Sequence, residues 1–120
     1  MKITEIKKYP LSHDGRISLY IEVCTDNGLK GLGEVGVPNM GKTVISAIEH
    51  LEKRLIGEDP WESEKLWQIM FRGNFFPPGV IYSSAIAAID IALWDLKAKS
   101  VDMPLYKLLG GCLLYTSPSP

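Results

Sequence analysis

The chain has 120 residues, of which 46% are hydrophobic and 22% are charged. That length and apolar content suffice for one modest hydrophobic core and argue against wholesale disorder. The 13 Lys and Arg residues against 14 Asp and Glu residues give a net charge of -1. The sequence therefore lacks the basic excess with which nucleic-acid-binding proteins neutralise phosphates.

Targeting signals and cysteines point to an ordinary intracellular protein. The amino terminus lacks the continuous apolar region of a secretory signal, and no apolar run approaches the length of a membrane span. The only cysteines, Cys24 and Cys112, are too few for a disulfide framework and too isolated for a structural zinc site. We therefore expect a cytoplasmic location, with no membrane and no nucleic acid as partners.

The first third of the sequence predicts three antiparallel strands. Residues 2–11 alternate loosely between apolar and charged side chains, and residues 11–16 are expected to form a loop. The clean alternation from Ile17 to Val23 predicts a half-buried strand whose apolar side chains share one face. Asn27-Gly28 favours a tight hairpin, so residues 29–35 are expected to return antiparallel and complete a meander.

After Gly41 the apolar residues recur every three or four positions, which is typical of helices. One helix is expected after Gly41, a second after Asp59-Pro60, and a long third helix from about Ser83 to Ser100. The Gly- and Pro-rich aromatic segment 72–80 is expected to be a loop, and residues 105–109 a last short turn. The predicted fold class is α+β: a three-stranded antiparallel meander followed by a helical bundle.

The segment GVPNMGKT, residues 36–43, fits the phosphate-binding P-loop formula G-x-x-x-x-G-K-[ST]. A P-loop also needs a buried parallel strand before it and a neighbouring strand that ends in a magnesium-binding Asp. The preceding segment is instead glycine-rich and is expected to be one arm of a hairpin. A solvated loop that carries Lys42 is therefore the favoured interpretation, with nucleotide binding as the lesser alternative.

The stretch AIAAIDIALWDLKAKSVDMPLYKLLG, residues 85–110, resembles the amino-terminal signature of the mandelate racemase and muconate lactonizing enzyme group of the enolase superfamily. A G-x-G-E segment at residues 31–34 and a G-x-D-P junction at residues 57–60 precede it in the family's order. The resemblance covers essentially residues 1–111. Within the group, residues 56–79 look most like the acid-sugar dehydratases, such as the galactonate dehydratases.

The resemblance implies that residues 1–111 form an enolase-like capping domain whose carboxy-terminal (β/α) barrel is missing from this chain. In the family, acidic barrel residues bind Mg²⁺, and a Lys or His base removes the proton α to a carboxylate. No catalytic residue and no metal ligand can be assigned here. We therefore expect a fragment of a magnesium-dependent lyase or isomerase that is inactive alone, from a full-length homo-oligomer. A stand-alone binding or interaction module is the alternative.

Two loops correspond by position to the specificity loops of the family, at residues 11–16 and 36–42. The resemblance implies that these loops contact the distal end of a carboxylate-bearing sugar acid or similar small molecule. The side chains that could hydrogen-bond its hydroxyls or carboxylate are His13, Asp14, Arg16, Asn39 and Lys42. His13 is not expected to be a catalytic base, because the sequence identifies no partner group for it.

Two carboxylates in the signature segment do not form a pair. Asp90 and Asp95 are five residues apart, which places them roughly 140° apart around a helix. They are therefore not expected to converge on one substrate. Asp95 and Lys99 instead have the spacing of a helical ion pair.

The last segment, CLLYTSPSP at residues 112–120, breaks the preceding pattern. It can be encoded as TGT CTC TTA TAC ACA TCT CCG AGC CCA, which resembles a transposon-end sequencing adapter running into its index-primer sequence. We interpret residues 112–120 as a non-native tail, which implies that the gene is interrupted after Gly111. The alternative is a natural, disordered Ser/Pro-rich tail.

Overall fold

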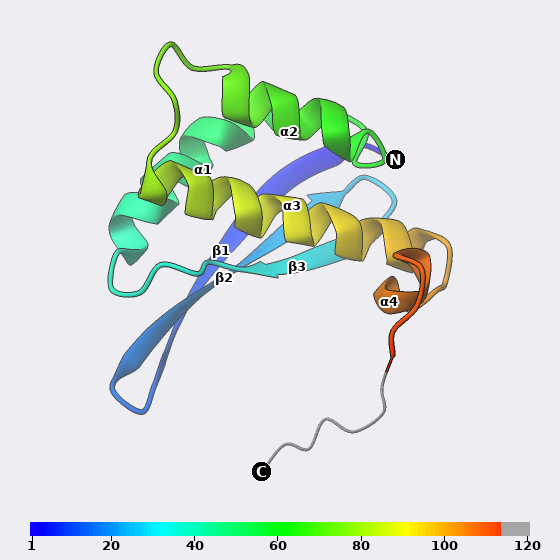
Figure 1. Cartoon of the computed structure of the whole chain (residues 1–120), viewed down its shortest axis with the longest axis horizontal. Helices are drawn as coiled ribbons and strands as arrows, with labels where there is room; N and C mark the ends of the chain where they lie inside the picture. Colours follow the sequence, from blue (N-terminus) through cyan, green and yellow to red (C-terminus); the bar gives the residue numbers. More distant parts are fainter. Residues whose placement is uncertain (114–120) are drawn as a thin grey trace.

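The computed structural model describes residues 1–113, which form a three-stranded antiparallel sheet followed by helices (Figure 1). The strands pair in the order β1-β2-β3 and are β1 (Ile3–His13), β2 (Arg16–Thr25) and β3 (Lys30–Glu34). The helices are α1 (Gly41–Leu55), α2 (Ser63–Arg72), α3 (Val80–Ser100) and α4 (Leu105–Leu108). The predicted α+β meander with following helices is confirmed, whereas the interpretation of the tail falls largely outside the described residues.

The core lies between the sheet and the helices. Helices α1 and α3 pack against strands of the sheet, and α2 packs on α1 and α3. On β2, Leu19, Ile21 and Val23 are buried as the alternation predicts, and each fully buried aliphatic side chain contributes roughly 2 kcal/mol. Ile17 contradicts the prediction, because 59% of it is exposed. It lies near the start of β2, paired with Ser12, and this end of the β1–β2 hairpin extends beyond the helical layer (Figure 1).

The predicted loop at residues 11–16 is wrong in its extent. Strands β1 and β2 remain paired up to His13 and Arg16, and only Asp14-Gly15 forms the turn. Both turn residues have positive φ angles, 49° and 73°, which suit the right-handed twist of a two-residue hairpin. The segment is therefore the end of a long two-stranded arm, which we call the β1–β2 arm (residues 9–20).

Helix α3 packs unusually closely on β3 because the strand carries glycines on its inward face. A Cβ atom at Gly31 would overlap the carbonyl oxygen of Ala92, and one at Gly33 would overlap that of Ala88. Each of the two glycines thus lies directly against the α3 backbone at an alanine. The G-x-G sequence thus serves helix-to-strand packing and does not need a ligand to explain it.

The outer edge of β3 is bound by side chains of α3. The Leu32 amide donates to Asp95 Oδ2 at 2.8 Å, and Lys99 Nζ donates to the Lys30 carbonyl oxygen at 2.8 Å. Asp95 and Lys99 also form the expected ion pair, at 2.9 Å. These contacts satisfy backbone groups that an edge strand would otherwise leave to solvent or to another chain.

Helices α1 and α4 begin where the sequence predicts, but α2 does not. Helix α2 starts at Ser63, after a turn in which the Trp61 amide donates to Asp59 Oδ1 at 2.9 Å. The Asp59 side chain therefore caps this turn and not the helix. The helix begins one turn later than the Asp-Pro signal indicates.

Helix α3 starts at Val80, slightly before the predicted Ser83, and crosses the whole domain. Its buried residues face both the sheet and the other helices, but Val80 and Ile91 on its outer side are 72% and 50% exposed. Helix α3 has many apolar residues, but it is not long and apolar enough to traverse a bilayer, and the same holds for the other helices within residues 1–113.

Candidate functional site

A cavity of about 970 Å³ lies between the β1–β2 arm and the segment that joins β3 to α1. Its lining combines the ends of β1 and β2 with residues 34–43 and the first turns of α1. These parts are distant in the sequence and meet because the meander places β3 beside β2.

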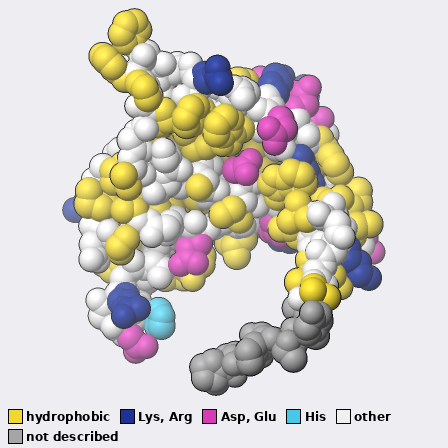
Figure 2. Space-filling view, in the orientation of Figure 1, with side chains coloured by type: hydrophobic (Ala, Val, Ile, Leu, Met, Phe, Trp, Pro, Cys, Tyr) yellow, Lys and Arg dark blue, Asp and Glu magenta, His cyan; other side chains and the backbone are white. Residues whose placement is uncertain are grey.

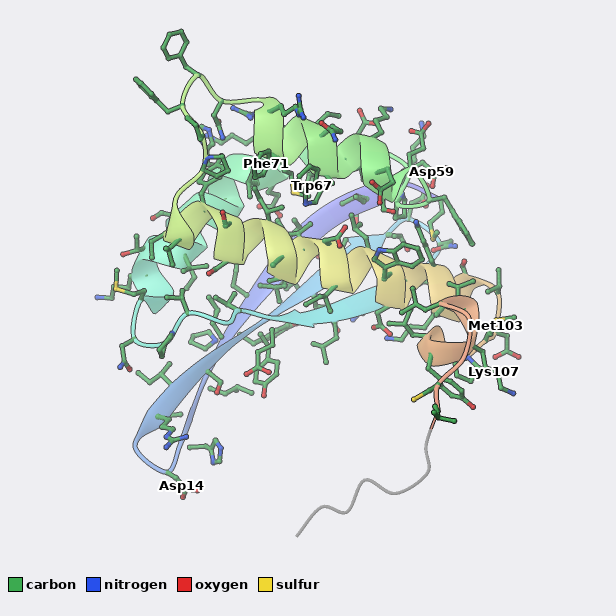
Figure 3. All side chains as sticks on the ribbon, in the orientation of Figure 1. Asp14, Asp59, Trp67, Phe71, Met103 and Lys107 are labelled. Atoms are coloured by element: carbon green, nitrogen blue, oxygen red, sulfur yellow. The ribbon has the colours of Figure 1, made fainter. Side chains whose placement is uncertain are left out.

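The structure brings together three of the five side chains selected from the sequence. Arg16 from the arm lines the cavity together with Asn39 and Lys42 from the β3–α1 segment. His13 and Asp14 lie at the tip of the arm and do not line it, as Figure 3 shows for Asp14. Their only described partners are each other, with His13 Nδ1 and Asp14 Oδ2 3.4 Å apart and both side chains largely exposed.

Sequence reasoning missed several residues that line the same cavity. Glu34 stands at the end of β3 and closes the G-x-G-E segment, which supports the family resemblance but does not place Glu34 at the cavity. Ser18 and Thr43 add hydroxyl groups, but nothing in the sequence distinguishes them from other surface hydroxyls. The exposed Ile17 and Met40 add apolar surface. The cavity therefore offers two cations, one carboxylate, an amide and hydroxyls, a set suited to binding a polar small molecule.

The geometry of the β3–α1 segment disfavours a phosphate cradle. Strand β3 is an edge strand that pairs antiparallel to β2, whereas a P-loop follows a parallel strand. Asn39 has a φ of 60°, a left-handed conformation that Asn tolerates. The turn directs the chain into α1, so the match to the P-loop formula is accidental in this fold.

A second polar cluster joins α2 to α3, away from the cavity. Lys97 is buried, donates to Ser63 Oγ and lies with its Nζ 4.0 Å from the ring centroid of Trp94. Burial lowers the pKa of Lys97, while burial and the nearby Glu64 raise the pKa of Asp90. The contacts of Lys97 with Ser63 and Trp94 give this lysine a structural role that needs no ligand.

The described residues do not fit a metal centre. Within residues 1–113, no three His, Cys, Asp or Glu side chains come together in an arrangement that could hold a metal ion. Asp90 and Asp95 also have different surroundings, because Asp95 binds β3 and Asp90 lies near Lys97.

A meander covered by helices on one face, with a polar cavity beside its first hairpin, gives this chain an α+β architecture. Residues 13–110 match the model of the mandelate racemase / muconate lactonizing enzyme N-terminal domain. The chain belongs to this family, which is part of the enolase superfamily.

Curated relatives share this region at substantial identity. The chain is 41% identical over 111 residues to the D-galactonate dehydratase of Verminephrobacter eiseniae, covering 92% of this chain and 28% of that protein. It is 42% identical over 112 residues to RspA of Cellvibrio japonicus, a D-galactonate dehydratase family member, with the same coverage. The chain thus spans less than a third of the length of these relatives.

Solved structures show the same architecture. An enolase from Agrobacterium radiobacter, bound to sodium and L-malate, superposes with a TM-score of 0.88 at 35% identity, over 95% of this chain and 29% of that one. An enolase from Pantoea ananatis, with bound D-gluconate and magnesium, superposes with a TM-score of 0.85 at 35% identity, over 92% of this chain and 27% of that one.

Proposed function

We propose that this chain is the capping part of a magnesium-dependent acid-sugar dehydratase and that its cavity holds the substrate end remote from the reacting carbon. The observation that carries the proposal is the meeting of Arg16 with Asn39 and Lys42 around one cavity of about 970 Å³. A sugar acid presents hydroxyls and carboxylates, and guanidinium, ammonium and amide groups bind both.

The comparisons support this substrate class. The relatives include D-galactonate dehydratases, and the related enolases of known structure bind L-malate or D-gluconate. Both of these ligands are hydroxy acids. A cavity that mixes cations with hydrogen-bonding groups and some apolar surface suits the carbon chain and hydroxyls of such molecules.

Exposed apolar side chains on this domain support the proposal that a separate catalytic domain packs against it. Large apolar side chains are exposed along the β3 edge, the outer face of α3 and the carboxy-terminal segment, namely Leu32, Ile91, Met103, Tyr106 and Leu109. Exposed apolar side chains of this size are typical of an interface. The part of the relatives that this chain does not cover is the proposed partner of this surface.

In this proposal the rest of the protein supplies the magnesium chemistry, and residues 1–113 supply contacts to the substrate. When bound, magnesium stabilises the charge that develops on the substrate carboxylate as the neighbouring proton is removed. Residues 1–113 do not fit a magnesium site, so their own part is to bind the remote end of the substrate and keep water from the reacting end. Alone, the chain is expected to have no dehydratase activity.

A domain exchange tests the proposal. Residues 1–111 would replace the matching residues of the D-galactonate dehydratase of V. eiseniae, with which they are 41% identical. We expect the chimera to convert an acid sugar to the keto acid formed by loss of water, and a chelator to abolish this activity. The barrel without a cap and the 120-residue chain alone are the matched controls.

Two results would contradict the proposal. A folded chimera that turns over no aldonate or aldarate would show that this domain does not cap such a substrate. A chelator-sensitive dehydratase activity of the isolated chain would show that residues 1–120 contain catalytic machinery of their own. A soluble chain that binds an unrelated small molecule tightly would favour the stand-alone module instead.

A further inference from the structure

Two cations of the cavity have no charged partner within the described part of the chain. Arg16 comes from the end of the β1–β2 arm and Lys42 from the first turn of α1, and both residues are exposed. Within residues 1–113, neither forms an ion pair or a side-chain hydrogen bond. Elsewhere on the domain, five lysines do form ion pairs, namely Lys7, Lys8, Lys30, Lys65 and Lys99. Arg16 and Lys42 are therefore available to a ligand.

The cavity is positively charged although the whole chain is not. Among the described residues that line it, Arg16 and Lys42 face a single acidic side chain, Glu34, whereas the chain has a net charge of -1. Figure 2 shows a basic side chain at the end of the arm, at the lower left of the view. The two cations attract an anion, while Glu34 repels one but accepts hydrogen bonds from hydroxyl groups.

The start of α1 adds to this positive potential. Residues 41–43 line the cavity and begin the helix, so their backbone amides have no carbonyl partner within it. Met40 provides no side-chain cap, and no acidic residue stands in the first turn. The helix dipole places a partial positive charge at this end. Lys42 and the helix terminus therefore act on a ligand with the same sign.

The proposed function decides which end of a substrate reaches these groups. In that proposal the reacting carboxylate lies at the magnesium ion, outside this chain, and the cavity takes the remote end. An aldonate ends there in a neutral hydroxymethyl group, whereas an aldarate ends in a second carboxylate. Once the closed site excludes water, an aldonate would leave two cations without a counter-charge, which is costly.

We propose that the cavity is a subsite for a second carboxylate, bound by Arg16 and Lys42, so that the enzyme prefers a sugar diacid (an aldarate) to the matching aldonate. This inference rests on the proposed function. A guanidinium can hold a carboxylate through two parallel hydrogen bonds, and Lys42 adds a cation from the other side of the cavity. Glu34, at the end of β3, is assigned to the hydroxyl groups next to that carboxylate.

The chimera tests this preference with two substrates that differ only at the remote carbon. Galactonate and galactarate share the reacting end, and galactarate has a carboxylate where galactonate has a hydroxymethyl group. We expect the chimera to show a kcat/KM for galactarate about a hundredfold above that for galactonate. The unmodified D-galactonate dehydratase of V. eiseniae controls for the rest of the enzyme, and it should not show this preference.

Loss of either cation should reduce the preference, whereas loss of the Glu34 charge should increase it. Arg16→Gln and Lys42→Gln should each lower kcat/KM about a hundredfold for galactarate but only about tenfold for galactonate, because hydroxyls bind a cation more weakly than a carboxylate does. Glu34→Gln should raise the ratio about threefold. Lys53→Gln, at an exposed position of α1 outside the cavity, should leave the ratio unchanged. A folding defect would lower both values alike.

Binding to the 120-residue chain gives a readout that needs no catalytic domain. In a nuclear magnetic resonance titration, millimolar galactarate should shift the amide signals of Arg16 and of residues 39–43. Galactonate should bind about tenfold more weakly, a smaller difference than in the closed enzyme because water screens the open cavity. The double variant Arg16→Gln with Lys42→Gln should remove the difference between the two acids.

The outcomes separate this inference from the proposed function. A chimera that dehydrates galactonate as efficiently as galactarate would overturn the carboxylate subsite and leave the proposed function intact. A folded chimera that turns over neither acid would contradict the proposed function, and the titration would still accept or reject the subsite. Equal binding of the two acids by the isolated chain, or a preference that survives loss of both cations, would overturn the subsite as well.

Discussion

The two ends of the three-stranded sheet are built in different ways. At one end, β3 presents Gly31 and Gly33 to α3 so closely that no Cβ atom fits. At the other end, the β1–β2 arm extends past the helices, and Arg16 and Ile17 line an open cavity with residues 34–43. One end is fixed by backbone contact, and the other is covered by no helix.

The difference between the two ends indicates which positions of this domain tolerate substitution. The closely packed end allows no added atom without separating a helix from a strand, because protein interiors are close-packed. At the open end, polar side chains can be exchanged with little effect on folding, which is the usual arrangement for binding residues carried by a rigid scaffold. The side chains that line the cavity can therefore change without loss of the fold.

The largest expected effect comes from adding one methyl group at the packed end. Gly33→Ala places a Cβ atom against the carbonyl oxygen of Ala88, and neither backbone can yield locally. We expect the free energy of unfolding to fall by about 3 kcal/mol or more. Urea denaturation followed by circular dichroism measures this loss.

The matched control is the same substitution at the open end. Gly36 has no atom within 4 Å of its Cβ position and no left-handed φ. Gly36→Ala should therefore change stability by no more than about 0.5 kcal/mol. If the two alanine variants unfold at the same urea concentration, the contrast between the two ends of the sheet is wrong.

An intermediate effect is expected for the cations of the cavity. In the chimera described above, Arg16→Ala and Lys42→Ala should each raise KM about tenfold, which corresponds to about 1.4 kcal/mol of lost binding. His13→Ala, at the tip of the arm and outside the cavity lining, should change KM by less than about twofold. Steady-state kinetics with an aldonate substrate distinguishes them, and a larger effect of His13 would move the binding site to the arm tip.

The smallest effect is a pH dependence of stability that arises on the packed side. Burial lowers the pKa of Lys97 in the folded state, so the unfolded chain binds the proton more readily below its ordinary pKa of about 10.4. The parent chain should therefore gain stability, relative to Lys97→Met, as the pH rises from 7 towards 10.

Urea denaturation of both proteins at pH 7 and pH 10 measures this difference, which should be a fraction of the Gly33→Ala effect. Lys107→Met, at an exposed position, controls for the loss of one positive charge. A difference between parent and Lys97→Met that shrinks as the pH rises would contradict the sign of the argument.

Local patterns predicted the identity and order of the elements but not all of their limits. The alternation in β2 and the helical period after Gly41 were sufficient to predict the type of each element. A half-buried strand and an amphipathic helix each place apolar residues at a characteristic spacing in the sequence. The limits failed where tertiary contacts decided them. The tip of the arm, residues 11–16, was predicted as a loop, and the exposed Ile17 carries the same pattern as a buried strand residue.

The candidate site was located only in part from the sequence. Resemblance selected two loops and five polar residues, but the sequence could not show that Arg16 meets Asn39 and Lys42 while His13 does not. That distinction depends on the length and direction of the paired arm. Glu34 was missed for the same reason, because its place at the cavity follows from the β2–β3 register.

By itself, the sequence determined the α+β class, the antiparallel meander and the family, since these follow from local periods and from a contiguous signature. Only the tertiary structure decided why two glycines stand in β3 and which loop residues share a cavity. The physical reason is that periodicity reports which face of an element avoids water, whereas proximity between distant segments depends on how whole elements pack.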